Sequence, residues 1–125
     1  MSRIQVELAD GKTTYRPGEA VEGVAFWELD APPASIEIRL FWRTQGKGTV
    51  DVQVVEALPQ AGAGPSDRRA FRFLLPAAPY SVSGVLVSIV WGVEVVAEPR
   101  SESAAVEITV SPTGEEIRLR KATGP

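Results

Sequence analysis

Hydrophobic and polar residues alternate along most of this 125-residue chain. Ile4, Val6 and Leu8 alternate with polar neighbours, and the two-residue period recurs later in the chain. Successive side chains of a β-strand point to opposite faces, so this period indicates strands with one buried face. No segment of the sequence keeps the i, i+3, i+4, i+7 apolar spacing of a helix. The pattern predicts strands near residues 3–9, 13–16, 20–29, 35–45, 49–58, 69–75, 85–97 and 104–111.

Glycine and proline residues separate these strands and indicate turns. Asp10-Gly11 suits a tight hairpin, and Pro17-Gly18 suits a turn in which the glycine has a positive φ. The segment 46–48 would join two strongly alternating strands, and the Gly/Ala/Pro-rich segment 59–67 is predicted to be a mobile loop. Short strands at this spacing predict an antiparallel sandwich or barrel.

The segment Val85–Val96 is apolar on both faces of its predicted strand. Val87, Ile89 and Trp91 mark one face, and Leu86 and Val90 belong to the other. Such a strand is either central and covered on both sides, or part of an association surface. Both interpretations stay open, so homo-oligomers are among the expected states.

The composition excludes several classes of chemistry. The chain has no cysteine and no histidine, which rules out disulfides, thiolate zinc sites and a histidine general base. Its net charge of -3 gives no general attraction to nucleic acid or to an anionic membrane. The first residues lack an apolar stretch of signal-peptide length, and residues 85–97 are too few to span a bilayer. We therefore expect a soluble, cytoplasmic, non-enzymatic protein without metal or cofactor.

Four cationic residues are candidate binding residues. Arg68, Arg69 and Arg72 form the densest basic group, which could hold a phosphate or carboxylate by forked hydrogen bonds or could be a solvated strand face. Lys47 lies in the sequence Gly-Lys-Gly-Thr, which ends like a phosphate-binding loop. It lacks the leading glycine and the following helix of that motif, so a hairpin turn accounts for it better.

Two aromatic pairs, Phe26-Trp27 and Phe41-Trp42, occur within predicted strands. Adjacent strand residues point to opposite faces, so one member of each pair should be inside and the other outside. The outward members could form a sugar-stacking or protein-binding patch, or they could be covered by another part of the chain.

Four motifs follow one another along residues 4–111. Tyr15–Gly23 has the pattern Tyr-x-Pro-Gly-Glu-x-Val-x-Gly, and the alternating strand Ile36–Leu40 comes next. Phe71–Pro76 and Pro79–Gly84 have the patterns Phe-x-Phe-x-Leu-Pro and Pro-x-Ser-x-x-Gly. Ile89–Val95 has the pattern Ile-x-Trp-x-Val-x-Val. This order resembles the arrestin-like β-sandwich, specifically the N-terminal lobe of arrestin family proteins.

The resemblance implies an all-β fold, an antiparallel two-sheet β-sandwich of immunoglobulin-like or arrestin-like type. It implies one domain over residues 1–112, with 113–125 as a C-terminal tail or an additional edge strand. The paired lysines that arrestins place near the first strand have no equivalent beside Ile4–Leu8, so phosphate sensing is not carried over.

A domain of this type would be a protein-binding scaffold or adaptor. It would bind its protein partner by edge-strand addition or through its loops, without nucleic acid or membrane insertion. One alternative is a small-ligand or carbohydrate-binding sandwich that uses an exposed aromatic side chain. Another is an enzyme that works through carboxylates or a bound metal.

Overall fold

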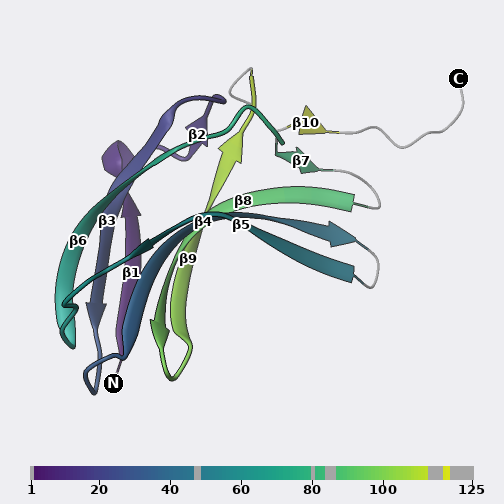
Figure 1. Ribbon diagram of the computed structural model, residues 1–125. Helices are drawn as coiled ribbons and strands as arrows, with labels where there is room; N and C mark the ends of the chain where they lie inside the picture. Colours follow the sequence, from purple (N-terminus) through teal and green to yellow (C-terminus); the bar gives the residue numbers. More distant parts are fainter. Residues whose placement is uncertain (1, 47–48, 80, 84–86, 113–116, 119–125) are drawn as a thin grey trace, which may run out of the picture.

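Two β-sheets pack face to face around one hydrophobic core (Figure 1). The structure is a computed structural model that describes residues 2–46, 49–79, 81–83, 87–112 and 117–118. No helix in these ranges is long and apolar enough to cross a membrane. The elements are β1 (Arg3–Leu8), the 3-10 turn η1 (Ala9–Gly11), β2 (Thr14–Tyr15), β3 (Ala20–Glu28), β4 (Ser35–Gly46), β5 (Thr49–Pro59), β6 (Ser66–Leu74), β7 (Val82–Ser83), β8 (Val87–Glu98), β9 (Glu102–Val110) and β10 (Ile117–Arg118).

The smaller sheet has three strands in the order β1-β3-β6, all antiparallel. The larger sheet follows the path β10-β7-β8-β4-β5, and β9 pairs with both β8 and β2. The pairs β2–β9 and β7–β10 are parallel. The prediction of a two-sheet, all-β fold is therefore confirmed, but the larger sheet is mixed and not wholly antiparallel. The eight strands expected from the two-residue period are all present.

The predicted Asp10-Gly11 hairpin is wrong. Asp10 has φ 57° and Gly11 has φ 64° inside η1. These left-handed conformations turn the chain out of the three-stranded sheet, so β2 does not return along β1. It runs beside the end of β9, where Thr14 faces Thr109 and the two strands are parallel.

Two tryptophans anchor the core and also hold loops. Trp27 and Trp91 are fully buried. The Trp27 indole N–H donates to the carbonyl of Gly64 at 3.0 Å, and that of Trp91 donates to the carbonyl of Pro79 at 3.0 Å. The fully buried set also contains Phe73, Ile36, Ile38, Leu40, Val21, Val93, Val95, Val110 and Ser111.

The loop between β5 and β6 is held at several points, although the sequence predicted a mobile segment there. The Gln60 N–H donates to the Ile36 carbonyl at 2.8 Å, and the Leu29 N–H donates to the Pro65 carbonyl. The hydrogen bond from the Trp27 indole N–H, described above, holds the carbonyl of Gly64, which lies between Gln60 and Pro65 in the chain. Backbone and side-chain groups therefore tie this loop to β4, to the end of β3 and to Trp27, and its mobility stays a prediction.

Strand β8 occupies the centre of the larger sheet. β4 pairs along one side of it, and β9 and β7 share the other side. Trp91, Val93, Val95 and Val96 are buried. The apolar segment 85–96 is therefore a central strand whose side chains are covered at Trp91, Val93, Val95 and Val96 and half-buried at Ile89 and Val90, which favours the covered interpretation over the described side chains.

The Pro17-Gly18 turn has the predicted geometry. Gly18 has φ 84°, and the Glu19 N–H donates to the Arg16 carbonyl at 3.1 Å. The Glu19 carboxylate accepts hydrogen bonds from the Lys12 ammonium and from the Arg16 N–H, the latter at 2.7 Å. These two hydrogen bonds, that of Lys12 first, lower the pKa of Glu19 below its ordinary value of 4.5.

Acidification should loosen this turn by protonating Glu19. Because the folded-state pKa lies below the unfolded value of 4.5, the contribution to stability is fully present above pH 4.5. It is lost as the pH falls through the folded-state pKa. NMR titration of the side-chain carboxyl carbon should give a midpoint below 4.5, and Lys12→Ala should raise that midpoint. A midpoint at or above 4.5 in the unmodified chain would contradict the prediction.

Candidate functional site

The outer edge of β5 is an exposed strand edge of the larger sheet. β5 pairs with β4 along one side, and no strand among the described residues pairs with its other side. Every residue from 51 to 57 is exposed. Val52 is 58% exposed, Val54 40% and Val55 38%, which places them among the exposed large hydrophobic residues of the described chain. An unpaired strand edge presents backbone N–H and C=O groups that can bind another strand.

A β-bulge at Val55 decides how the side chains of β5 are distributed. Phe41 pairs with Val54, but the preceding residue of β4, Leu40, pairs with Glu56. Val55 is therefore the extra residue of the bulge, and it reverses the facing of everything beyond it. As a result Leu58 lies opposite Ile38 and packs against the core.

The valine face of β5 points away from the core, contrary to the half-buried strand that the alternation predicts. Val52 lies opposite Arg43 and Val54 opposite Phe41. Cross-strand partners share a face, and the core face of β4 carries Leu40 and Trp42 instead. The valines consequently lie on the outer face of the larger sheet.

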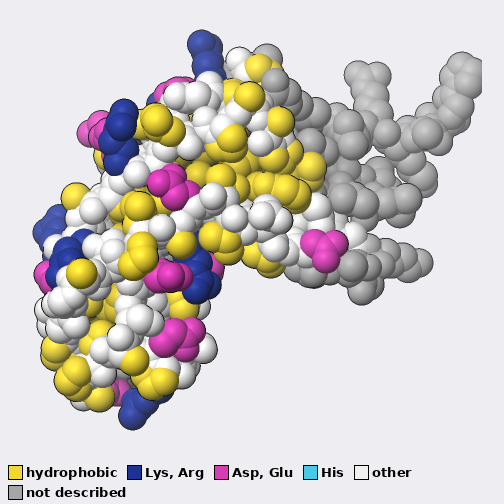
Figure 2. Space-filling view, in the orientation of Figure 1, with side chains coloured by type: hydrophobic (Ala, Val, Ile, Leu, Met, Phe, Trp, Pro, Cys, Tyr) yellow, Lys and Arg dark blue, Asp and Glu magenta, His cyan; other side chains and the backbone are white. Residues whose placement is uncertain are grey.

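β4, β5 and β8 continue beyond the three-stranded sheet, so this part of the larger sheet has no opposite layer from β1, β3 or β6 (Figure 1). Figure 2 shows hydrophobic side chains grouped over the middle of the molecule, beside this extension. An exposed apolar strand on such an extension is accessible from both faces and along its edge.

The candidate arginines do not converge on one ligand position. Arg68 and Arg72 lie on the outer face of β6 and Arg69 on its inner face, as the alternating burial of β6 shows. Arg69 pairs with Asp67 at 2.8 Å, and Arg72 pairs with Glu22 at 3.1 Å.

The remaining candidate cations give no built site. The Arg68 N–H and then the Arg69 guanidinium lower the pKa of Asp67, which shows that this carboxylate is held by its own strand. The Arg68 side chain forms no ion pair with the rest of the described chain. Lys47 lies outside the described residues.

The aromatic pairs divide between the faces as strand geometry requires. Trp27 and Phe41 are buried, and Phe26 and Trp42 are half-buried. The Arg3 guanidinium lies 5.9 Å from the Phe26 ring centroid. Phe41 is buried against Gly92, where a Cβ would come within 2.6 Å of its ring. No broad aromatic surface is therefore left for sugar stacking among the described residues.

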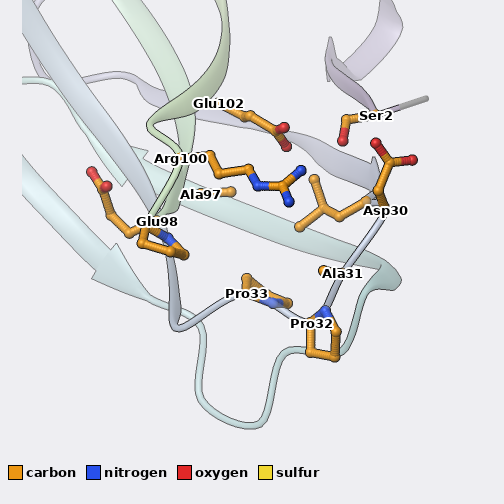
Figure 3. Close-up of a pocket in the computed structure, with 11 residues that line it drawn as sticks. Ser2, Asp30, Ala31, Pro32, Pro33, Ala97, Glu98, Arg100 and Glu102 are labelled. Atoms are coloured by element: carbon orange, nitrogen blue, oxygen red, sulfur yellow. The ribbon is translucent and has the colours of Figure 1, made fainter.

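A small cavity of about 180 Å³ lies at one end of the sandwich, where segments 29–33 and 97–102 meet. Asp30, Glu98, Arg100 and Glu102 are among the residues that line it; the Arg100 guanidinium extends toward Asp30 and lies near Glu102, whereas the Glu98 carboxylate points away (Figure 3). The Ser101 hydroxyl donates to the Glu98 carboxylate at 3.1 Å. In the part of the chain that the structure describes, no cluster of three or more acidic side chains could hold a metal ion.

Comparison with known proteins relates the fold to solved structures. No family model and no curated protein matches the chain. The crystal structure of Spo0M, a sporulation control protein from Bacillus subtilis, matches with a TM-score of 0.62 at 19% sequence identity. The match covers 87% of this chain and 49% of that protein. At this identity the likeness shows the fold alone: the chain shares the β-sandwich of one half of the Spo0M structure.

Proposed function

We propose that this chain is a non-enzymatic protein-binding module of arrestin-like type, which adds an extended segment of a partner protein to the outer edge of β5. The exposed edge of β5, with Val52 at 58% exposure, is the observation that carries the proposal. The motif order along residues 4–111 supports the arrestin-like type.

The physical basis is main-chain hydrogen bonding. A partner strand satisfies the free N–H and C=O groups of the edge and gains specificity from alternate side chains. Edge strands that must stay unpaired usually carry lysine or proline. Residues 51–58 contain neither, although Pro59 ends the strand. The bulge at Val55 and the carboxylates of Asp51 and Glu56 are two other features that oppose strand addition, so a partner must follow the bulge and complement these charges.

The small-ligand alternative has less support. Two of the three tryptophans are fully buried, and Trp42 is half-buried. The end cavity of about 180 Å³ is smaller than common ligand pockets of ~300–1,000 Å³. Two hollows of about 560 Å³ over β1, β3 and β6 and about 380 Å³ beside residues 33–37 and 59–63 reach that size, but the one aromatic ring that lines them, Phe71, is buried. No exposed aromatic ring is therefore available there to stack on a sugar.

A library of random peptides displayed on phage tests the proposal. Peptides selected on the unmodified chain should lose binding to the double variant V52K/V54K, because lysines on an edge oppose strand addition. Binding should also slow amide hydrogen exchange over residues 51–58 by about tenfold or more, because partner carbonyls then accept those N–H groups.

The matched control is V24K/A70K on the outer face of the three-stranded sheet. Val24 and Ala70 face each other across β3 and β6, in the sheet that does not contain β5. This control should keep peptide binding. Selected peptides that bind V52K/V54K as well as the unmodified chain would refute the proposed site, and so would unchanged exchange over 51–58.

A further inference from the structure

The β5 edge is acidic on one face and apolar on the other, and this division selects a kind of partner. We infer that the bound segment is an extended strand of alternating basic and aliphatic residues, with two cations placed beside Asp51 and Glu56. The inference rests on the proposed function of the β5 edge and specifies its ligand.

The register with β4 assigns each side chain to a face. Asp51 lies opposite Thr44 and Glu56 opposite Leu40, so both carboxylates are on the face that carries the core side chains of β4. Val52 and Val54 are on the other face. A strand added to the edge would continue both faces, because neighbouring residues across a pair point the same way.

The bulge sets the spacing that a partner must have. Asp51 and Glu56 are five residues apart on β5, but their partners Thr44 and Leu40 are four apart on β4. Four residues is an even number of steps, so a regular strand has two such residues on one face. The partner would therefore carry its cations at positions i and i+4, with aliphatic residues at i+1 and i+3.

Among the described residues, neither carboxylate has a cation paired with it. No ion pair in the described chain includes Asp51 or Glu56, and both are exposed. The nearest cations on β4, Arg39 and Arg43, belong to the opposite face.

Those two arginines are also already engaged. Arg39 contacts Glu37 at 2.8 Å and Glu94 at 3.6 Å, and Arg43 contacts Glu107 at 3.0 Å. Their charges are therefore engaged on the other face, and incoming lysine or arginine would meet carboxylates that no cation of the described residues pairs with.

The same charges disfavour a second copy of this chain as the occupant. Residues 51–58 contain two carboxylates and no cation. Pairing β5 with β5 would bring two further carboxylates to the edge, and like charges across a strand pair are destabilising. Charge complementarity therefore favours a basic partner strand.

Two synthetic peptides test the inference. Both are capped and built from threonine and valine; one has lysine at positions i and i+4, and the other has glutamate there. Fluorescence anisotropy should show the lysine peptide binding about tenfold more tightly than the glutamate peptide at low salt, with the difference shrinking as salt rises.

In the variant D51K/E56K the preference should reverse. The control E7K/E28K makes the same charge change on the outer face of the three-stranded sheet and should keep the original preference.

Each other outcome overturns the inference in a distinguishable way. Equal binding of the two peptides, abolished by V52K/V54K, would leave edge-strand addition intact and show that charge does not select the partner. A switch of preference in the E7K/E28K control would show attraction by net charge only. Self-association in sedimentation, abolished by V52K/V54K, would identify a second copy as the occupant. If neither peptide binds, the inference fails, and the phage selection decides the proposed function independently.

Discussion

Replacing Trp91 with alanine should lower the free energy of unfolding by about 3–5 kcal/mol. Trp91 is fully buried at the centre of β8, where it lies opposite Trp42 on one side and Ile108 on the other. The substitution removes the largest side chain of this central strand and leaves a cavity between the sheets. It also frees the Pro79 carbonyl, which accepts the indole N–H at 3.0 Å.

Urea unfolding followed by circular dichroism measures the loss without depending on the removed fluorophore. Trp91→Phe is the matched control, because it keeps an aromatic ring but removes the hydrogen bond. Its loss should be smaller than that of the alanine variant and include about 1–3 kcal/mol for the unsatisfied carbonyl. An alanine variant within about 1 kcal/mol of the unmodified chain would show that Trp91 does not anchor the core.

Gly23→Ala should be the second severe substitution, with a loss of about 3 kcal/mol in unfolding free energy. Gly23 lies in β3, between β1 and β6. An added Cβ would overlap the backbone carbonyl oxygen of Glu7 and come within 2.7 Å of the Phe71 ring. A flexible side chain could move aside, but a strand carbonyl cannot, so β1 has to shift away from β3.

Gly64→Ala provides the comparison for this effect. Nothing lies within 4 Å of a Cβ built at Gly64. Its unfolding free energy should therefore stay within about 0.5 kcal/mol of the original value. Amide exchange should accelerate along β1 in Gly23→Ala alone. Equal stabilities of the two variants would show that the close approach of β1 and β3 does not limit the fold.

The strands were predictable from sequence because their signal is local. Alternation located all eight expected strands, and the Pro17-Gly18 turn was predicted with its positive φ. The direction of β2 was not predictable, because Asp10-Gly11 suits either a hairpin or an exit from the sheet. Its parallel partner β9 is about a hundred residues away in sequence, and contacts at such separation leave no local pattern.

The candidate site was much less predictable. Val52, Val54 and Leu58 all have even numbers, so alternation alone assigns them to one face. The bulge at Val55 separates them, and the register with β4 sends the valines outward and Leu58 inward. A two-residue period shows that one face is apolar but does not show which face the fold covers. The arginine group shows the reverse case. Its members are close in sequence and were predicted to act together, but they are divided between the two faces of β6.

The loop after β5 holds one end of a projecting part of the larger sheet. Hydrogen bonds of Gln60, Gly64 and Pro65 hold the chain just after β5, while β4, β5 and β8, which are paired along their lengths, extend together past the three-stranded sheet. The deflection of an elastic extension under a given force grows with distance from its support. A ligand seated near Leu58 therefore meets a stiffer edge and loses less freedom on binding than one seated toward Asp51, which must also restrain the three-strand extension.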